Sequence, residues 1–347
     1  MKHLVECVPN FSEGQDANII DEIASRIDSV KNVKLLSVEP DKDYNRTVVT
    51  FVGEPEAVKE AAFQTTKAAS ELIDMRNHKG EHPRLGAVDV VPFVPLSGTT
   101  MADCVRLANE YGQRVATELG IPVFLYEEAA AKPDRINLAT IRKGEYEGLA
   151  EKLNDPNWFP DFPVAGATQF NPKSGATVTG ARFFLIAYNV NLKTNDKSIA
   201  HEIALRIRES GRPMKNEKGE VVKDKKGKTV NVPGSLKSVK AMGVLLDRFN
   251  IAQISINLTN FNDTMPHVAF EEVKKEAQSL GVEVTGSEII GLVPKDALIA
   301  AGKFYLGEQL NNLNVSEMDL INLASQYLGL SQFETFDPNK KIIEYMI

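Results

Sequence analysis

The side chains best suited to proton transfer lie together in one short polar segment, HKGEHPRLGAVDV, which begins at His78. Imidazole gains and loses a proton near neutral pH, so His78 and His82 are the first candidates for a general acid or base. For His78 the alternative is a helix cap or an exposed surface position. His82 is flanked by Glu81, Arg84 and Asp89, and these carboxylates could orient its ring or simply pair with Arg84.

The string from His78 to His82 also matches the His-x-x-Glu-His spacing of some zinc peptidases. That chemistry needs both histidines on one face of a continuous helix. Gly80 lies between them and Pro83 follows directly, and both residues disfavour such a helix. We therefore expect a loop at this point and no bound metal.

A second candidate is Arg46, which lies beside Asn45 where a polar turn enters an apolar run. An arginine in that position can hold a carboxylate through two parallel hydrogen bonds. The alternative is an ion pair with Asp41 or Asp43 in the adjoining turn. The residues alone leave both interpretations open.

The segment GATVTGAR, residues 175–182, superficially suggests a phosphate-binding loop. A P-loop requires Lys and Ser or Thr after its second glycine, followed by a helix. Ala181 and Arg182 occupy those places and we predict a strand to follow, which argues against hydrolysis of ATP or GTP. We expect the glycines to let a ligand or the other half of the chain approach the backbone closely.

Hydrophobic periodicity predicts the elements that position these residues. In the first half we expect strands over 4–7, 33–38, 46–52, 86–96 and 122–126, and helices over 19–27, 56–75 and 100–119. Thr100 and Asp103 have the spacing of a capping box for the third helix. Pro92 and Pro95 lie inside a predicted strand, which suits an edge strand or a bulge.

The same order begins again in the second half of the chain. We expect strands over 182–191, 236–246, 251–258 and 282–285, and helices over 198–208 and 266–280. Both halves therefore start β-α-β-β-α-β, which is the ferredoxin-like order. The predicted fold class is α+β, with one subdomain over residues 1–180 and a second over residues 181–347.

Two stretches lack periodicity. Residues 145–175 are rich in turn formers, and such a long irregular stretch between two compact halves often lines a site. Residues 212–233 are rich in lysine and are expected to form a solvated loop, with a lid or an arm that attracts anions as the alternative.

Composition limits the class of protein. The chain has 347 residues and a formal charge of −7, which disfavours broad binding to nucleic acid. Cys7 and Cys104 are its two cysteines, too few for a disulfide framework, and we expect both in the core. The N-terminal residues do not resemble a signal peptide and no run of about 18 apolar residues occurs, so we expect a cytoplasmic protein away from membranes.

Four segments together resemble the glutamate formimidoyltransferase family. They are LVECVPNFSEG at 4–14, NRTVVTFVG at 45–53, GEHPRLGAVDVVPFVP at 80–95 and GATVTGAR at 175–182. Weaker similarity continues through AQISINL, IIGLVPKDAL and the terminal IIEYMI, so the resemblance covers nearly the whole chain.

The resemblance implies transfer of a formimidoyl group from N-formimidoyl-L-glutamate to tetrahydrofolate, a late step in histidine degradation. Tetrahydrofolate would be the co-substrate, and two ferredoxin-like subdomains would enclose a ligand cleft in a homodimer. In animals the same domain is fused to a cyclodeaminase. Since this chain ends at Ile347, ring closure would be left to a separate enzyme.

The resemblance also assigns roles to residues. His82 matches the family's catalytic histidine, and Glu39 is the carboxylate expected to hold the cationic amidinium of the donor. Cations on the matched segments, Arg46, Arg84 and Arg182, are expected to hold substrate carboxylates. The folate loop aligns with residues 163–175, and its expected contacts are Phe170, Asn171, Pro172, Lys173, Ser174 and Gly175.

Three other functions remain open from the sequence. A formyl transferase acting on N-formyl-glutamate or 5-formyltetrahydrofolate would use the same residues. A folate-storing or regulatory protein would bind without transferring, and would leave the histidine segment without a task. A metallohydrolase is the third, and it would contain stoichiometric zinc.

Overall fold

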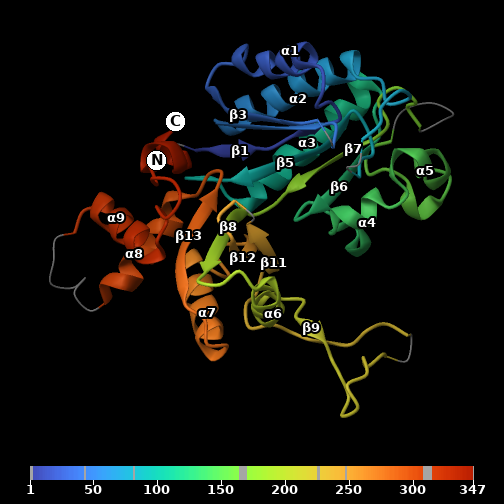
Figure 1. Ribbon diagram of the computed structural model, residues 1–347. Helices are drawn as coiled ribbons and strands as arrows, with labels where there is room; N and C mark the ends of the chain where they lie inside the picture. The colour runs from blue at the N-terminus through green and yellow to red at the C-terminus, as the bar shows by residue number, and fades with distance from the viewer. Residues whose placement is uncertain are drawn as a thin grey trace. The chain divides into compact units, whose positions relative to one another are not determined.

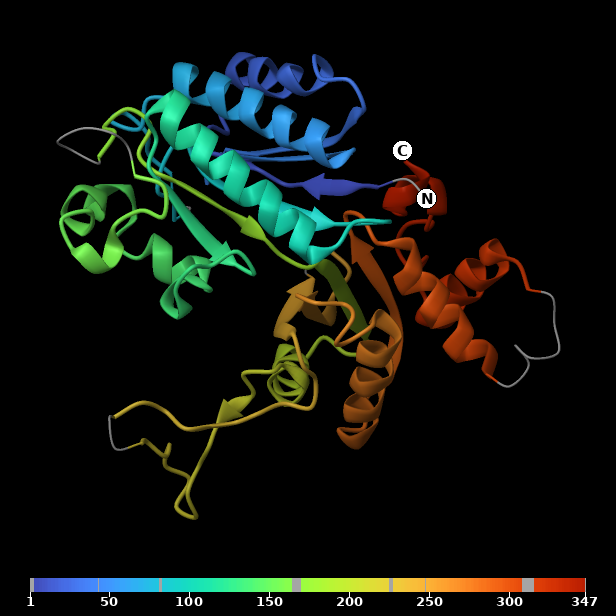
Figure 2. The ribbon, with the colours of Figure 1, turned by 180° about the vertical axis from the view of Figure 1, so that it is seen from behind.

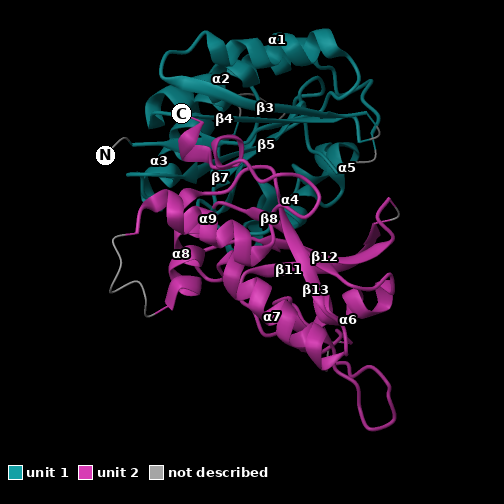
Figure 3. Cartoon of the chain, turned by 60° about the vertical axis from the view of Figure 1, so that its left-hand side comes forward, with its two compact units in different colours: residues 1–183, 347 teal, residues 184–346 magenta. Residues whose placement is uncertain are grey.

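The computed structural model describes two compact units, of which unit 1 ends at Phe183 and unit 2 begins at Phe184 (Figure 3). The sequence had suggested a boundary after residue 180. Within the described ranges, no helix is both long enough and apolar enough to cross a bilayer. Those ranges are 3–42, 44–80, 83–163, 170–224, 227–246, 248–307 and 315–346.

Unit 1 is a mixed α+β unit built on one sheet (Figure 1). Its strands are β1 (Val5–Cys7), β2 (Asn10–Phe11), β3 (Val33–Asp41), β4 (Arg46–Gly53), β5 (Val88–Pro95), β6 (Val123–Glu127) and β7 (Thr177–Ala181). Its α-helices are α1 (Ala17–Asp28), α2 (Pro55–Leu72), α3 (Met101–Leu119), α4 (Leu138–Arg142) and α5 (Glu145–Lys152). Single 3₁₀ turns lie at Pro133–Arg135 and Pro156–Trp158.

The sheet of unit 1 combines antiparallel and parallel pairing. β1 and β2 follow one another between β4 and β5, and β3 lies outside β4; all of these pairs are antiparallel. β7 then joins β5, and β6 joins β7, in parallel. The long helix α3 makes the crossover between β5 and β6, as parallel pairing requires.

Helices α1, α2 and α3 cover one face of this sheet (Figure 2). Their apolar residues recur every three or four positions, and those stripes pack on the inward residues of β1, β4 and β5 in one buried cluster. Thr100 caps α3, and Asp103 completes the predicted capping box. Cys7 and Cys104 are free and fully buried in this cluster, as predicted, and burial raises the pKa of Cys104 to about 12.

A second, smaller cluster lies beneath α4 and α5. Ile141 of α4 and Leu149 of α5 pack against Phe124, Tyr126 and Val178 of the strands β6 and β7. The stretch 145–175 was expected to be irregular, but it contains helix α5. That helix was missed because Leu149 is its only buried residue, so the sequence shows no apolar stripe.

Of the two settings predicted for Pro92 and Pro95, the edge strand is wrong, whereas the pairing of β5 with β2 has a bulge or irregularity between Asn10 and Phe11. β5 is a central strand, bordered by β1 and β2 on one side and by β7 on the other. Pro92 is tolerated because the neighbouring chain is interrupted between β1 and β2, where Val8 donates its N–H to the Pro92 carbonyl at 3.4 Å.

The segment 175–182, expected as a loop before a strand, is mostly strand β7 itself. Every residue of β7 is buried, and Thr179 donates its hydroxyl to the Val91 carbonyl at 2.8 Å. A Cβ on Gly180 would overlap the carbonyl oxygen of Tyr126. The glycine therefore serves close packing of β7 on β6 within unit 1, which is neither of the approaches expected from the sequence.

Unit 2 is built on a four-stranded antiparallel sheet. Its elements are β8 (Ile186–Leu192), α6 (Lys197–Ile207), β9 (Arg212–Pro213), β10 (Asn231–Val232), β11 (Val239–Leu246), β12 (Ile251–Leu258), α7 (Pro266–Ser279), β13 (Val284–Ile290), α8 (Lys295–Leu306), α9 (Glu317–Leu328) and α10 (Pro338–Lys341), with a final 3₁₀ turn at Ile343–Tyr345. The strand order is β11-β12-β8-β13. Alternate residues of β8 and β12, such as Tyr188 and Ile254, are buried beneath α6 and α7.

The lysine-rich stretch 212–233 is exposed along most of its length. It connects α6 to β11, and its two ends pair as the short strands β9 and β10. This arrangement agrees with the predicted solvated loop, because the described residues of the stretch bury almost no apolar side chain.

Candidate functional site

Three loops of unit 1 are joined through the side chain of Asn45. Its Oδ1 accepts from the Gly14 N–H at 2.9 Å, and its Nδ2 donates to the Lys79 carbonyl at 2.8 Å. Asn45 adopts a left-handed conformation with φ of 47°, which asparagine tolerates better than most residues. A Cβ on Gly80 would overlap the carbonyl oxygen of Tyr44, so the loops also touch along their backbones. These contacts bring together three of the segments that carried the sequence resemblance.

His78 is held at both ring nitrogens. Its Nε2 lies 3.0 Å from the carbonyl oxygen of Asn45, and Arg84 donates its Nε–H to Nδ1 at 3.2 Å. A carbonyl oxygen can only accept and a guanidinium can only donate, so the ring carries its proton on Nε2. Burial lowers the pKa of His78, and the Arg84 guanidinium lowers it further, against the Asn45 carbonyl bond and the Glu13 and Glu147 carboxylates. His78 is therefore neutral at pH 7.

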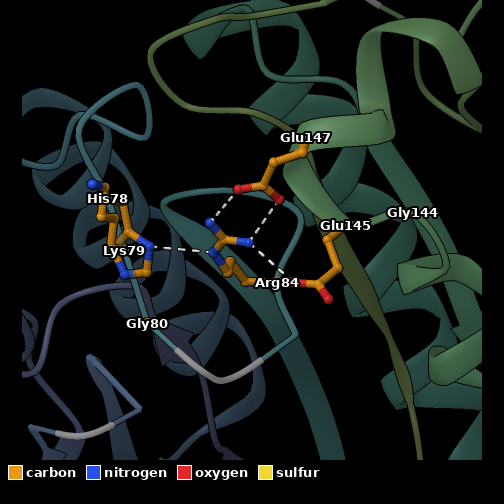
Figure 4. A pocket seen from close by; sticks show the side chains of 7 residues that line it. All are labelled: His78, Lys79, Gly80, Arg84, Gly144, Glu145 and Glu147. Carbon is orange, nitrogen blue, oxygen red and sulfur yellow. Dashed lines mark hydrogen bonds and ion pairs between the residues drawn. The ribbon is translucent and has the colours of Figure 1, made fainter.

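Arg84 is buried, with a side-chain exposure of 7%, and is paired with two glutamates of α5 (Figure 4). Its Nη1 and Nη2 donate to the two carboxylate oxygens of Glu147 at 2.9 and 2.6 Å, and Nη1 also donates to Glu145 at 3.0 Å. These ion pairs outweigh the effect of burial and raise the pKa of Arg84. The same hydrogen bonds lower the pKa of Glu147, so both partners stay charged.

These side chains line a cavity of about 480 Å³. Its wall combines cations, carboxylates and one neutral imidazole: His78, Lys79, Gly80, Arg84, Gly144, Glu145 and Glu147. A ligand that carries both an anionic and a cationic group would find partners for each in it. A second cavity of about 330 Å³ lies beside Ser12, Asn45 and Asp74, and His78 borders that one too.

Asp89 lies on β5 and is 1% exposed. It forms an ion pair with Arg142 of α4, and its Oδ1 accepts from the Leu85 N–H at 3.0 Å. Of the two roles considered for Asp89, pairing with Arg84 is excluded by this geometry. Arg46 is half-buried close by: burial and the charge of Arg142 lower the pKa of Arg46, while Asp89 and Asp41 act in the opposite direction.

The predicted folate-loop residues that the structure describes are packed into unit 1. Asn171 donates to the Gly120 carbonyl at 2.9 Å, and the N–H groups of Lys173 and Ser174 bond its side-chain oxygen. The Pro172 carbonyl accepts from the hydroxyl of Tyr146 at 2.5 Å. The Tyr146 ring also lies 5.8 Å from the Phe170 ring, between centroids. The end of this loop therefore has a fixed shape.

Gly175 provides a test of this fixed shape. Its φ is 68°, and a Cβ there would overlap the Leu85 carbonyl oxygen and lie 2.7 Å from the Gly86 Cα. We expect Gly175→Ala to lower the free energy of unfolding by about 1–3 kcal/mol, because it combines a strained backbone with a clash. The measurement is urea unfolding followed by circular dichroism.

Gly148 is the matched control, since a Cβ there would meet nothing within 4 Å. It lies inside helix α5, where Gly148→Ala should raise the free energy of unfolding by about 0.5–1 kcal/mol. Equal effects of the two substitutions would contradict the assigned role of Gly175.

Glu39 and Arg182, two of the predicted site residues, do not line the 480 Å³ cavity. Glu39 is exposed on β3, where it lies opposite Val48 of β4. Arg182 follows β7; its Nη1 donates to the Phe183 carbonyl at 3.1 Å, and its guanidinium lies near the buried hydroxyl of Tyr126.

His82 and Glu81 lie outside the described residues, as do residues 164–169 of the predicted folate loop. Lys79 and Gly80 are not helical, in agreement with the expected loop. Among the residues that the structure does describe, no group of three or more His, Cys, Asp or Glu side chains could hold a metal ion.

The site contains residues that the sequence did not single out, above all Glu145, Glu147 and Arg142. They lie on short helices with few buried residues, some 50 to 70 positions from their partners, and no motif connects them. Only the mixture of charges around Glu145 could have drawn attention to this part of the chain.

Comparison with known proteins covers both units. Residues 4–182 match the profile of the formiminotransferase domain, N-terminal subdomain, and residues 187–347 match that of the formiminotransferase domain. A formimidoyltransferase-cyclodeaminase of Dictyostelium discoideum is 48% identical over 347 residues, which is all of this chain and 61% of that protein. The chain thus spans about three fifths of that bifunctional relative.

Two shorter relatives align along almost their whole length. A glutamate formimidoyltransferase of Streptococcus pyogenes is 45% identical over 88% of this chain and 94% of its own. One of Thermoplasma acidophilum is 48% identical over 90% of this chain and 94% of its own. With both of its units matched, this chain belongs to the formiminotransferase domain family.

Proposed function

We propose that this protein transfers a formimidoyl group from N-formimidoyl-L-glutamate to tetrahydrofolate, giving 5-formimidoyltetrahydrofolate and L-glutamate in histidine degradation. The observation that carries the proposal is the alignment with two proteins named glutamate formimidoyltransferase, each covered over 94% of its length. Tetrahydrofolate is the co-substrate, and no metal takes part in the proposed reaction.

The reaction needs one group that can move a proton between two nitrogens. N5 of tetrahydrofolate attacks the formimidoyl carbon, and a tetrahedral intermediate forms with both nitrogens attached. His82 accepts the proton from N5 and delivers it to the departing glutamate nitrogen as the C–N bond breaks. Holding both substrates together supplies much of the rate. His78 is unsuited to this role, because both of its ring nitrogens are already bonded.

The 480 Å³ cavity supports this assignment by its charges and its position. It borders the loop that carries His82 in the sequence, and it contains both carboxylates and a lysine. The donor has a cationic amidinium and anionic carboxylates, so both kinds of partner are needed. We place the glutamate part of the donor near Lys79 and its amidinium near Glu145, with Glu39 as a further candidate.

The remaining contacts are assigned by position. Arg46 and Arg182 hold substrate carboxylates in this proposal, and Arg84 borders the cavity while its guanidinium is engaged by protein groups. The folate contacts are placed on residues 170–175.

In both units the order of strands and helices, β-α-β-β-α-β with the first strand between the third and the fourth, supports ferredoxin-like subdomains. We also propose a cytoplasmic homodimer.

We expect the purified chain to convert N-formimidoyl-glutamate and tetrahydrofolate to glutamate and 5-formimidoyltetrahydrofolate. The two measurements are the release of glutamate and the absorbance of the folate product. A chelator should leave the rate unchanged, since no step uses a metal. Parallel assays with N-formyl-glutamate and 5-formyltetrahydrofolate identify a preference for a formyl donor. Tight folate binding without transfer from any donor would overturn the enzymatic assignment.

A further inference from the structure

His82 lies in the sequence between His78 and Arg84, and the side chains of these two residues are in direct contact. Arg84 donates its Nε–H to His78 Nδ1 at 3.2 Å, so residues six apart in the sequence are joined directly. This bond fixes the distance between the side chains of His78 and Arg84. Whatever conformation the enclosed residues adopt, the positions of their two ends are set by His78 and Arg84.

Each end of the loop is also anchored to a different part of unit 1. His78 donates its Nε2–H to the Asn45 carbonyl at 3.0 Å, and Asn45 is itself held by Gly14. At the other end, the Arg84 carbonyl accepts from the Tyr146 N–H at 2.9 Å. The Arg84 guanidinium donates hydrogen bonds to both carboxylate oxygens of Glu147. The chain from His78 to Arg84 is thus fixed to the β3–β4 turn at one end and to α5 at the other.

We propose that His78 and Glu147 are positioning residues for the transfer reaction: they hold Arg84, and through it the segment that carries His82. This inference rests on the proposed function for its kinetic test. Neither residue is assigned contact with the reacting atoms. The pairing of Arg84 with both carboxylate oxygens of Glu147 is here called the anchor. It sets the orientation of the guanidinium, because two parallel bonds fix its plane as well as its distance.

The hydrogen bond from Arg84 Nε to His78 Nδ1, here called the tether, requires a neutral His78. A proton on Nδ1 would put an N–H opposite the Nε–H of Arg84 and a second positive charge beside the guanidinium, so the contact would break. The charged groups that face the ring are Arg84 on its own loop, Glu13 after β2 and Glu147 on α5. Lys79 lies next to it in the sequence and lines the same cavity.

The pH dependence follows from the direction of the shift. Burial lowers the pKa of His78 in the folded protein, so the unfolded chain, with a value near 6.5, binds the proton more readily. Stability from this group is therefore present above about pH 6.5 and is lost as the pH falls through the lower, folded value. Transfer activity should decline over the same acid range, because the tether opens there.

The first test replaces His78. Asparagine can accept from Arg84 but cannot titrate, whereas alanine offers no acceptor. We expect His78→Ala to lower kcat about 10- to 100-fold with little change in KM, the scale of a displaced catalytic group. His78→Asn should keep kcat within about threefold of the wild type and should lose the part of the acid decline that His78 causes. Equal kcat and equal pH profiles for the wild type and both variants would overturn the proposal.

The second test replaces Glu147. Glu147→Ala removes both bonds to Arg84 and should lower kcat as strongly as His78→Ala, while Glu147→Gln retains one acceptor and should recover part of the loss. Glu151→Gln is the matched control, since Glu151 is an exposed glutamate of the same helix. It should leave kcat unchanged. If Glu147→Ala were as active as the control, the anchor would not act on the reaction.

A measurement without substrate separates this inference from the proposed function. Amide hydrogen exchange should show faster exchange over residues 78–84 in Glu147→Ala than in the wild type, with the rest of unit 1 unchanged. Unchanged exchange in that segment would overturn the tether even in an active enzyme. An inactive wild type with the expected exchange pattern would instead overturn the proposed function alone.

Discussion

Replacing His82 with alanine is expected to lower the turnover of formimidoyl transfer about 100-fold or more, the usual scale for removing a general acid–base group. KM for the donor should change little, because the proposed role of His82 is to carry the proton and not to hold the glutamate carboxylates. The melting temperature should stay close to that of the wild type, because the neighbouring contacts His78–Asn45 and Arg84–Glu147 do not involve this residue. The measurement is steady-state kinetics with a thermal melt of the same sample.

His201→Ala is the control, since His201 is an exposed histidine on α6 of unit 2. It should leave turnover unchanged. An active wild type with an equally active His82→Ala variant would keep the function and reject the mechanism. A variant that lost activity together with its fold would leave the decision to His82→Gln, which keeps the polarity of the side chain without a titrating group and should be folded but slow.

The second large effect concerns stability. Asp89→Ala is expected to lower the free energy of unfolding by about 3–5 kcal/mol, the cost of breaking a buried ion pair from one side. Arg142, whose side chain is 15% exposed, would keep its charge without its partner. The Leu85 N–H would lose its acceptor as well. Denaturant unfolding followed by circular dichroism and by the fluorescence of Trp158 in unit 1 measures the loss.

Asp89→Asn should fall between the wild type and Asp89→Ala, because the amide oxygen can still accept from the Leu85 N–H. Glu22→Gln is the control: Glu22 pairs with Arg26 on the exposed side of α1, and such surface pairs contribute little. A loss for Asp89→Ala no larger than for Glu22→Gln would show that the Asp89–Arg142 pair is not a stabilising contact of unit 1.

Hydrophobic periodicity predicted the β-α-β-β-α-β order with which each unit begins, whereas β7, α8 and α9 were not predicted. The stripe of α3 and its Thr100 cap were readable because every turn of that helix buries a residue on one side. Helix α5 was not readable, because it buries a single leucine. The central position of β5 was not readable either, because Pro92 is tolerated only through a break in a strand that lies far from it in sequence.

The candidate site divides in the same way. The histidines, Asn45 and the arginines could be selected from their chemistry and local spacing, since acid–base and charge properties belong to the side chain itself. Their partners could not be selected. Glu147 is 63 positions from Arg84, and Asp89 is 53 positions from Arg142. The sequence near an arginine does not show which of many carboxylates pairs with its guanidinium.

The sequence by itself determined which groups could move a proton or hold a charge, and, through its resemblance, the family. Only the tertiary structure decided that His78 is a neutral ring bonded at both nitrogens, and that Arg84 forms ion pairs with Glu145 and Glu147. The physical reason is that protonation and pairing depend on burial and on distances of about 3 Å, and packing sets both across segments that are remote in sequence.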